Sequence, residues 1–77
     1  MNKIEKFLKK LSPAEGKEIQ EIILRIVGGK YENMDMRKIG GYVSRYRVRK
    51  GRIRIIFTLY DYGAVIEKVD FRNDNTY

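Results

Sequence analysis

The sequence predicts an α+β domain in which an N-terminal helical hairpin packs on a small antiparallel β-sheet. Three observations predict this class. Apolar residues recur at helical spacing through the first 27 positions, apolar and polar residues alternate from residue 42 onward, and glycine-containing turns separate the segments. Since 77 residues are enough for one domain, we expect a single domain spanning residues 1–77.

The first helix of the hairpin is expected over residues 1–11. Its apolar side chains fall at spacings of three, four and seven residues, which places them on one helical face, while the lysines lie mostly on the other. The members of the apolar face are Ile4, Phe7, Leu8 and Leu11. The following "SPAE" then predicts the start of a new helix.

The second helix is expected from Pro13 to about Val27. Ser12 is a good N-cap, Pro13 suits the first helical position, and Glu15 completes a capping box. A glycine pair at residues 28–29 ends the helix in the usual way. Its predicted apolar face consists of Ile19, Ile22, Ile23 and Ile26, widened by Leu24 and Val27.

Residues 30–42 show little periodicity and contain a second glycine pair, so we expect a connecting segment there. Three apolar side chains of this segment are expected to pack against the core: Met34, Met36 and Ile39. Period-2 alternation then predicts three strands joined by short turns, an antiparallel meander, at residues 42–49, 52–60 and 64–71. The apolar face of the middle strand comprises Ile53, Ile55, Phe57 and Leu59, and residues 72–77 are expected to be a polar tail.

The composition excludes several kinds of chemistry. The chain has no cysteine and no histidine, which excludes disulfides, thiolate metal sites, and both Ser-His-Asp and Cys-His catalysis. Its carboxylates are scattered, and nothing in the sequence pairs two of them, so we expect no metal and no small-molecule cofactor. No apolar run approaches the length of a membrane span and no signal peptide begins the chain, which predicts a cytoplasmic protein without a membrane partner.

The positive charge is concentrated in one part of the chain. Seventeen basic and ten acidic residues give a net charge of +7 and a pI near 9.8, as is typical of nucleic-acid-binding domains. Residues 37–60 contain eight basic residues and no acidic one. Because alternate strand residues lie about 6.6 Å apart on one face, Arg45, Arg47 and Arg49 are expected to form a row that matches a chain of phosphates.

Both the arginine row and the tyrosines allow a second interpretation. Basic residues on a strand face also serve to suppress edge-to-edge aggregation, so the row is either an anion-binding face or a solvated face. The tyrosines at positions 42, 46, 60 and 62 either stack on bases or pack half-buried against the core. Tyr77 is the exception, because it lies at the end of a polar tail without apolar neighbours and only base stacking is expected of it.

Three segments, in this order, resemble the RelE/ParE toxin superfamily of toxin–antitoxin systems: "RKIGGY", "YRVRKGRIRIIF" and "VDFRNDNTY". The resemblance extends over almost the whole chain from Ile4 onward. It implies a RelE/ParE-like fold and a toxin that inhibits translation by cleaving mRNA on the ribosome. It also implies two partners, which are a cognate antitoxin protein and the mRNA on the ribosome.

The resemblance also implies functional residues. The catalytic set is Arg54, Arg72 and Tyr77, and the RNA-binding set is Arg45, Arg47, Arg49, Lys50 and Arg52. The implied reaction is metal-independent attack of a ribose 2′-OH on the adjacent phosphodiester. Fixed positive charges near the phosphate stabilise the charge that develops in such a reaction.

Two other functions fit the same resemblance. One is a ParE-like inhibitor of DNA gyrase, which uses the fold without RNA chemistry. The other is a non-catalytic member that binds RNA or an antitoxin. RelE-type nucleases often carry lysine where this chain has Arg47 and Arg49, and arginine, unlike lysine, does not lose its proton in proteins.

Overall fold

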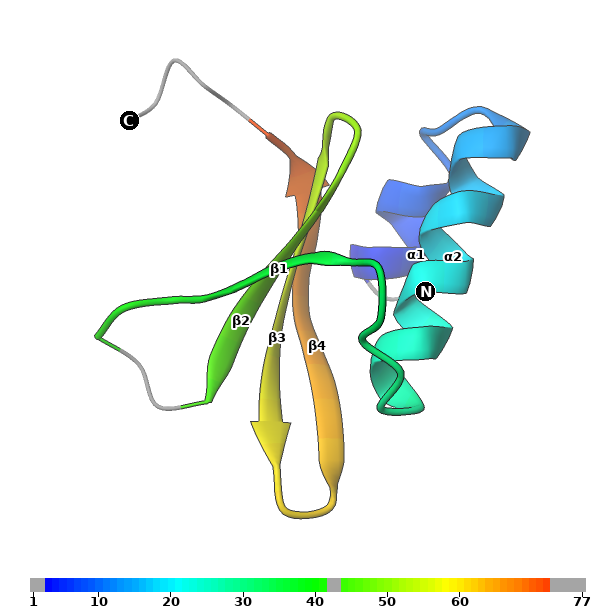
Figure 1. Cartoon of the computed structure of the whole chain (residues 1–77). Helices are drawn as coiled ribbons and strands as arrows, with labels where there is room; N and C mark the ends of the chain where they lie inside the picture. The colour runs from blue at the N-terminus through cyan, green and yellow to red at the C-terminus, as the bar shows by residue number, and fades with distance from the viewer. Residues whose placement is uncertain (1–2, 42–43, 73–77) are drawn as a thin grey trace.

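The computed structural model describes residues 3–41 and 44–72, which form two layers (Figure 1). One layer is helical, with α1 (Lys3–Leu8) and α2 (Pro13–Val27). The other is a four-stranded sheet made of β1 (Asp35–Lys38), β2 (Arg45–Lys50), β3 (Ile53–Tyr60) and β4 (Gly63–Phe71). All neighbouring strands are antiparallel, in the order β1-β2-β3-β4, and both helices lie on the same face of the sheet (Figure 1). The predicted α+β class is therefore confirmed.

The helical layer is smaller than the predicted hairpin. α1 has six residues, so most of this layer is α2 rather than two helices of similar length. After Leu8 the backbone tightens, because the amides of Lys10 and Leu11 donate to carbonyls three residues earlier. The residue before a proline avoids helical backbone angles, and Ser12, with ψ 157°, is extended. These two features end α1 before Leu11.

α2 begins and ends where the sequence predicts. The Ser12 hydroxyl accepts a hydrogen bond from the Glu15 amide at 3.2 Å, and the Gly28 amide donates to the Leu24 carbonyl at 2.9 Å. Its buried residues are Ile19, Ile22 and Ile26. The predicted widening of the apolar face by Leu24 and Val27 is wrong, because these side chains are 70% and 55% exposed.

The connecting segment predicted for residues 30–42 contains β1, so the sheet has four strands and not three. Met36 of β1 lies opposite Val48 and Arg37 lies opposite Arg47. A strand of four residues that carries one apolar side chain has too little alternation to be recognised, and only pairing with β2 defines it. β2 also differs from its predicted range, since Lys50 still pairs with Ile53 and the turn follows at residues 51–52.

The core lies between α2 and one face of the sheet. The fully buried side chains include Val48 of β2, Ile53, Ile55 and Phe57 of β3, and Ile19 and Ile26 of α2. The rings of Tyr31 and Tyr46 stack on Phe57, with centroids 5.9 and 5.5 Å away. Three of the four predicted apolar residues of β3 are therefore buried, while Leu59 is partly exposed near the end of the strand. Neither described helix has the length and apolar character that crossing a bilayer requires.

Candidate nucleic-acid interface

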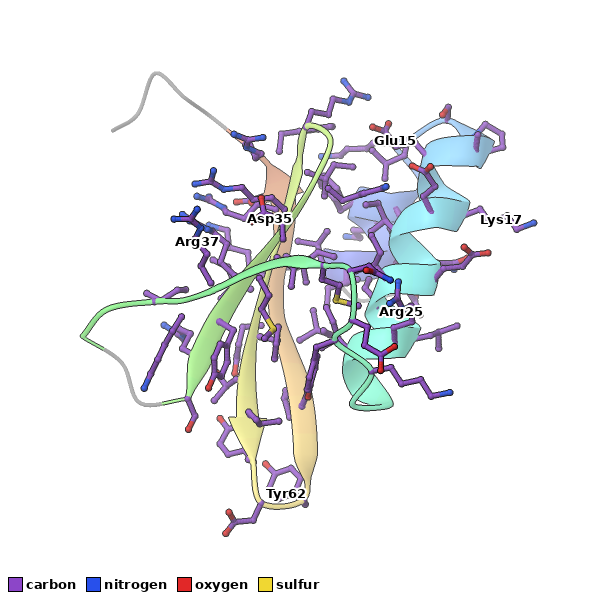
Figure 2. The ribbon with its side chains drawn as sticks, viewed as in Figure 1. Glu15, Lys17, Arg25, Asp35, Arg37 and Tyr62 are labelled. Carbon is purple, nitrogen blue, oxygen red and sulfur yellow. The ribbon has the colours of Figure 1, made fainter. Side chains whose placement is uncertain are left out.

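The face of the sheet turned away from the helices carries most of the strand arginines. Val48 is buried in the core, and because side chains alternate along a strand, Arg47 and Arg49 on either side of it point outward. Figure 2 shows Arg37 and Asp35 on this outward side, with α2 on the other side of the sheet. We call this surface the basic face and define it by Arg37, Arg45, Arg47, Arg49, Arg54 and Lys68.

Strand register arranges one row across the basic face in which the charges balance. Asp35 lies opposite Arg49, Arg49 opposite Arg54, and Arg54 opposite Asp70. The Arg54 guanidinium donates two hydrogen bonds to the Asp70 carboxylate, through Nε and Nη2, both at 3.3 Å. Lys68 Nζ also lies 3.3 Å from this carboxylate. Two arginines and two aspartates make this row nearly neutral, and its ion pairs hold Arg54 in place.

The adjacent row contains no carboxylate among its four positions. Arg37 lies opposite Arg47, Arg47 opposite Ile56, and Ile56 opposite Lys68. Like charges that face each other directly across two strands repel, so the Arg37–Arg47 pair costs stability. The two arginines extend from neighbouring strands, which places positive charge where nothing in the row neutralises it.

Arg47 is the most unusual side chain of this row. Its Nε is buried and has no hydrogen-bond partner among the residues that the structure describes. The pKa of Arg47 is lowered, first because the group is desolvated and then because Arg49 and Arg37 are close. An unsatisfied buried donor costs about 1–3 kcal/mol. The two facing guanidinium groups of Arg37 and Arg47 also repel each other, and an anion bound between them would relieve that repulsion. The arrangement therefore suits a bound oxyanion such as a phosphate.

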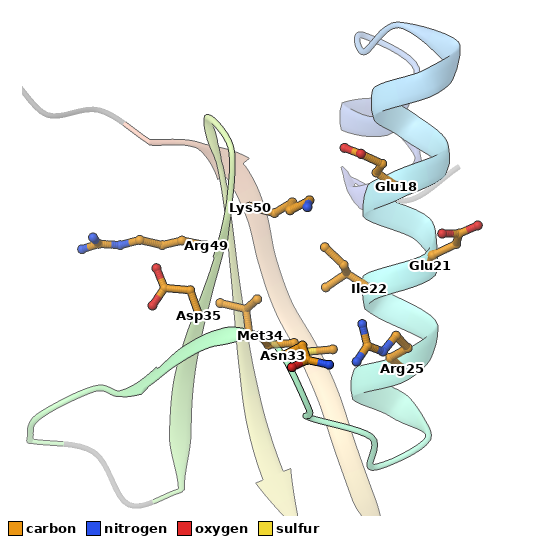
Figure 3. A pocket seen from close by; sticks show the side chains of 10 residues that line it. Glu18, Glu21, Ile22, Arg25, Asn33, Met34, Asp35, Arg49 and Lys50 are labelled. Carbon is orange, nitrogen blue, oxygen red and sulfur yellow. The ribbon is translucent and has the colours of Figure 1, made fainter.

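The structure separates Lys50 and Arg52 from the other predicted RNA-binding residues. Lys50 pairs with the buried Ile53, and Figure 3 shows Lys50 directed toward α2 while Arg49 points to the opposite side of the sheet. Arg52 binds the Glu15 carboxylate through Nε at 3.0 Å and Nη2 at 2.9 Å, and its guanidinium lies 4.7 Å from the centroid of the Phe71 ring. These contacts tie the β2–β3 turn to α2. The hydrogen bond from Arg52 also lowers the pKa of Glu15.

Two of the three predicted catalytic residues lie within the described structure, and they make different contacts. Arg54 is paired with Asp70 on the basic face. Arg72 donates from its backbone amide to the Arg52 carbonyl at 2.8 Å and from Nη1 to the Gly51 carbonyl at 3.2 Å, so it braces the β2–β3 turn. Tyr77 lies outside the described residues.

A groove of about 220 Å³ lies between α2 and the β1–β2 edge of the sheet (Figure 3). Its charged lining is mixed, with Glu18 and Glu21 against Arg25 and Lys50, while the Asp35 and Arg49 side chains are directed to the other side of the sheet (Figure 3). Since the two signs balance, the groove lacks the single-signed field that attracts a polyanion. In residues 3–41 and 44–72, no cluster of three or more His, Cys, Asp or Glu side chains is arranged to hold a metal ion.

Sequence reasoning did not assign Arg37 and Lys68 to the interface. Arg37 belongs to the acid-free run, which was the available signal, but its position opposite Arg47 depends on β1. Lys68 is aligned with Ile56 next to an irregularity in the β3–β4 pairing at Ile56/Phe57, which a regular period-2 pattern does not reveal.

The comparisons with known proteins give one similarity. No protein-family model matches the sequence, and no curated protein does. A solved chain from the "RelB-RelE antitoxin-toxin complex from Methanococcus jannaschii" is similar, with 26% sequence identity and a TM-score of 0.71. The match covers 86% of this chain and 80% of that chain. This similarity supports a role in a toxin–antitoxin system.

Proposed function

We propose that this chain is the toxin component of a toxin–antitoxin pair and a ribosome-dependent mRNA endoribonuclease. The observation that carries the proposal is the Arg37–Arg47 pair, which faces across two strands in a row without a carboxylate. The buried Arg47 Nε has no hydrogen-bond partner among the described residues. The similarity to a chain of an antitoxin–toxin complex supports the system to which it belongs. A compact domain with one strongly basic face suits the component that acts on RNA better than the component that neutralises it.

The chemistry assigned to the basic face is charge stabilisation. When a ribose 2′-OH attacks phosphorus, the hydroxyl loses its proton, the P–O5′ bond breaks, and the leaving 5′-oxygen gains a proton. Negative charge grows on the phosphate oxygens during this exchange, and fixed guanidinium groups stabilise that charge. Arg47 and Arg49 would hold the scissile and flanking phosphates. Arg54 would join them by exchanging the Asp70 carboxylate for a phosphate oxygen. Arginine does not release its proton in proteins, so proton transfer would fall to another group, for which Tyr77 is our candidate.

RNA binding without cleavage is the second candidate function. The Arg54–Asp70 pair favours it, because the carboxylate already takes two of the guanidinium hydrogen bonds that a transition state would need. The lack of histidine in the sequence favours it as well, because histidine is the commonest acid and base at neutral pH.

The test is a cell-free translation reaction with purified protein, in which mRNA 5′ ends are mapped by primer extension. We expect cuts at defined codon positions, and we expect Arg47→Ala to reduce them at least tenfold. Lys17→Ala is the matched control, because it removes one positive charge on α2, away from the basic face (Figure 2). Uncut mRNA with retained, salt-dependent RNA binding would establish the second candidate. Uncut mRNA together with inhibition of gyrase supercoiling would overturn both.

A further inference from the structure

Two tyrosines form an exposed aromatic stack at the β3–β4 turn. The rings of Tyr60 and Tyr62 lie 5.1 Å apart between centroids and are nearly parallel, at 3°. Tyr60 is 44% exposed and Tyr62 is 80% exposed. Figure 2 shows Tyr62 at the tip of this turn. Each ring covers one face of the other, so the stack presents flat aromatic surface to solvent.

Packing of the core does not account for this pair. Neither tyrosine belongs to the core cluster or to the partly buried residues packed on it, whereas Tyr31 and Tyr46 both stack on Phe57 inside. The backbone supports the stack locally, because Gly63 adopts φ 133°, a conformation that favours glycine, where β4 leaves the turn. The pair is thus an ordered aromatic surface with no evident part in holding the fold.

The stack lies at one end of the basic face. Side chains alternate along β3, so Tyr60 is on the same face as Thr58, Ile56 and Arg54. Arg45 lies opposite Thr58 and Arg47 lies opposite Ile56. Ile56 and Tyr60 are four positions apart, about 13 Å along the strand. The distance along the sheet from the level of Arg47 to the aromatic stack is therefore comparable with a few nucleotides.

We propose that the Tyr60–Tyr62 stack is a base-binding subsite for single-stranded RNA. A nucleobase stacks on the exposed tyrosine surface while the phosphates of the same strand lie over Arg45 and Arg47. Stacking of this kind tolerates any sequence, because every base has a flat π-face. The inference rests on the RNA-binding part of the proposed function and is independent of whether the RNA is cut.

Exposed tyrosines also occur in protein–protein interfaces, so a partner protein is the competing occupant. The tyrosine stack adjoins the basic face, which favours RNA, because single-stranded nucleic acids are bound by a basic groove combined with aromatic side chains. The test must show that the tyrosines bind a base, and it must separate this effect from attraction of the phosphates by the arginines.

The experiment measures binding of a fluorescein-labelled oligouridine of about ten nucleotides by fluorescence anisotropy, at several salt concentrations. A second oligonucleotide of the same length lacks bases but keeps the phosphates. We expect Tyr62→Ala to weaken oligouridine binding about 5- to 150-fold, the effect of losing one stacked base, without changing the salt dependence. Tyr62→Phe keeps the ring and should bind like the original chain. For the abasic oligonucleotide, Tyr62→Ala and the original chain should bind equally.

Three results would overturn this inference. One is equal oligouridine binding by Tyr62→Ala and the original chain, and another is an equal loss for the abasic oligonucleotide. The third is no measurable oligouridine binding by the original chain. Because Tyr62 is 80% exposed, its truncation should not unfold the domain, and circular dichroism checks this. Failure of the proposed function is separate, since it would show as uncut mRNA while the stacking results stay as expected.

Discussion

The two faces of the sheet are built from the same strands and have opposite properties. On the inward face, Val48, Ile55 and Phe57 are each no more than 1% exposed and belong to the hydrophobic core. On the outward face, Arg47 and Arg49 are only partly covered, and Arg47 has a donor without a partner among the described residues. Residues that are neighbours in sequence therefore face different environments.

The stability of the fold and the anion binding proposed for the outward face should therefore be separable. Burial of large apolar side chains stabilises the fold by about 1.5–3 kcal/mol for each side chain, and the inward face supplies that contribution. The outward face contributes repulsion between Arg37 and Arg47, which lowers stability unless an anion is bound. Substitutions on the inward face should act on folding, and those on the outward face should act on RNA binding.

The largest effect is expected from Phe57→Ala. Phe57 is 1% exposed and contacts two tyrosine rings, so its truncation should lower the free energy of unfolding by about 3–5 kcal/mol. For 77 residues the total is of the order of 4–12 kcal/mol, so much of the stability would be lost. Urea denaturation followed by circular dichroism measures the change. Phe57→Leu is the milder control, and a loss under about 1 kcal/mol for Phe57→Ala would contradict the assignment of the core.

Arg47→Ala should show the reverse pattern. We expect RNA binding to weaken at least tenfold, and the slope of log K against log salt to fall by about 0.7, the value for one phosphate contact on a single strand. The free energy of unfolding should stay the same or rise by up to about 1 kcal/mol, because a repulsive pair and an unsatisfied donor are removed. Anisotropy titrations and urea denaturation give the two quantities.

Lys17→Ala again provides the control for Arg47→Ala, since it changes the net charge equally at an exposed position of α2. Equal weakening of RNA binding by the two variants would mean that net charge, and not the basic face, attracts the RNA. Arg47→Lys tests the guanidinium itself, because lysine keeps the charge and lacks the planar fork.

Asp70→Asn should lower the stability of the fold and raise the affinity for RNA, both moderately. It removes a carboxylate that binds Arg54 and Lys68, so the free energy of unfolding should fall by about 1 kcal/mol. RNA binding should tighten a few-fold, because one negative charge leaves the basic face and the carboxylate no longer competes with phosphate for Arg54. The same titrations measure both effects. Weaker RNA binding by a folded Asp70→Asn variant would show that Arg54 acts in its paired position.

The smallest effect is expected from the pH dependence of the Glu15–Arg52 pair. Arg52 lowers the pKa of Glu15 in the folded chain, so the pair stabilises the fold above the ordinary glutamate pKa. This contribution is lost as the pH falls through the lowered, folded-state value. Arg52→Gln should therefore be less stable than the original chain at pH 7, with the difference disappearing in acid. Thermal unfolding from pH 7 to 2 measures it.

The pH dependence of the Glu15–Arg52 pair can be checked with a control variant. Glu15→Gln removes the titrating group, so Arg52→Gln should have little further effect in that background at any pH. The Arg52 side chain is 63% exposed, so added salt should reduce the effect of the pair. The difference in stability between the original chain and Arg52→Gln could instead stay constant into acid. That result would mean that Arg52 stabilises the fold by covering the Phe71 ring.

Local signals in the sequence determined the elements with strong periodicity or chemical caps. α2 follows from the Ser12 cap and the glycine pair that ends it, and β3 follows from its alternating isoleucines. The outward direction of Arg47 and Arg49 also follows, because period 2 places them on the other face of the strand from the buried Val48. These features depend on residues within a few positions of one another.

Tertiary structure decided everything that depends on contacts between distant segments. β1 exists through its pairing with β2, and that pairing places Arg37 against Arg47. The pairing of Arg54 with Asp70 and the separation of Arg52 from the basic face depend on strand register and on the position of α2. No local pattern encodes these contacts, because their energies arise only when residues far apart in sequence are brought together. The sequence thus determined which side chains are cationic and that Arg47 and Arg49 point outward, whereas packing determined which cationic side chains are paired with carboxylates and which face one another.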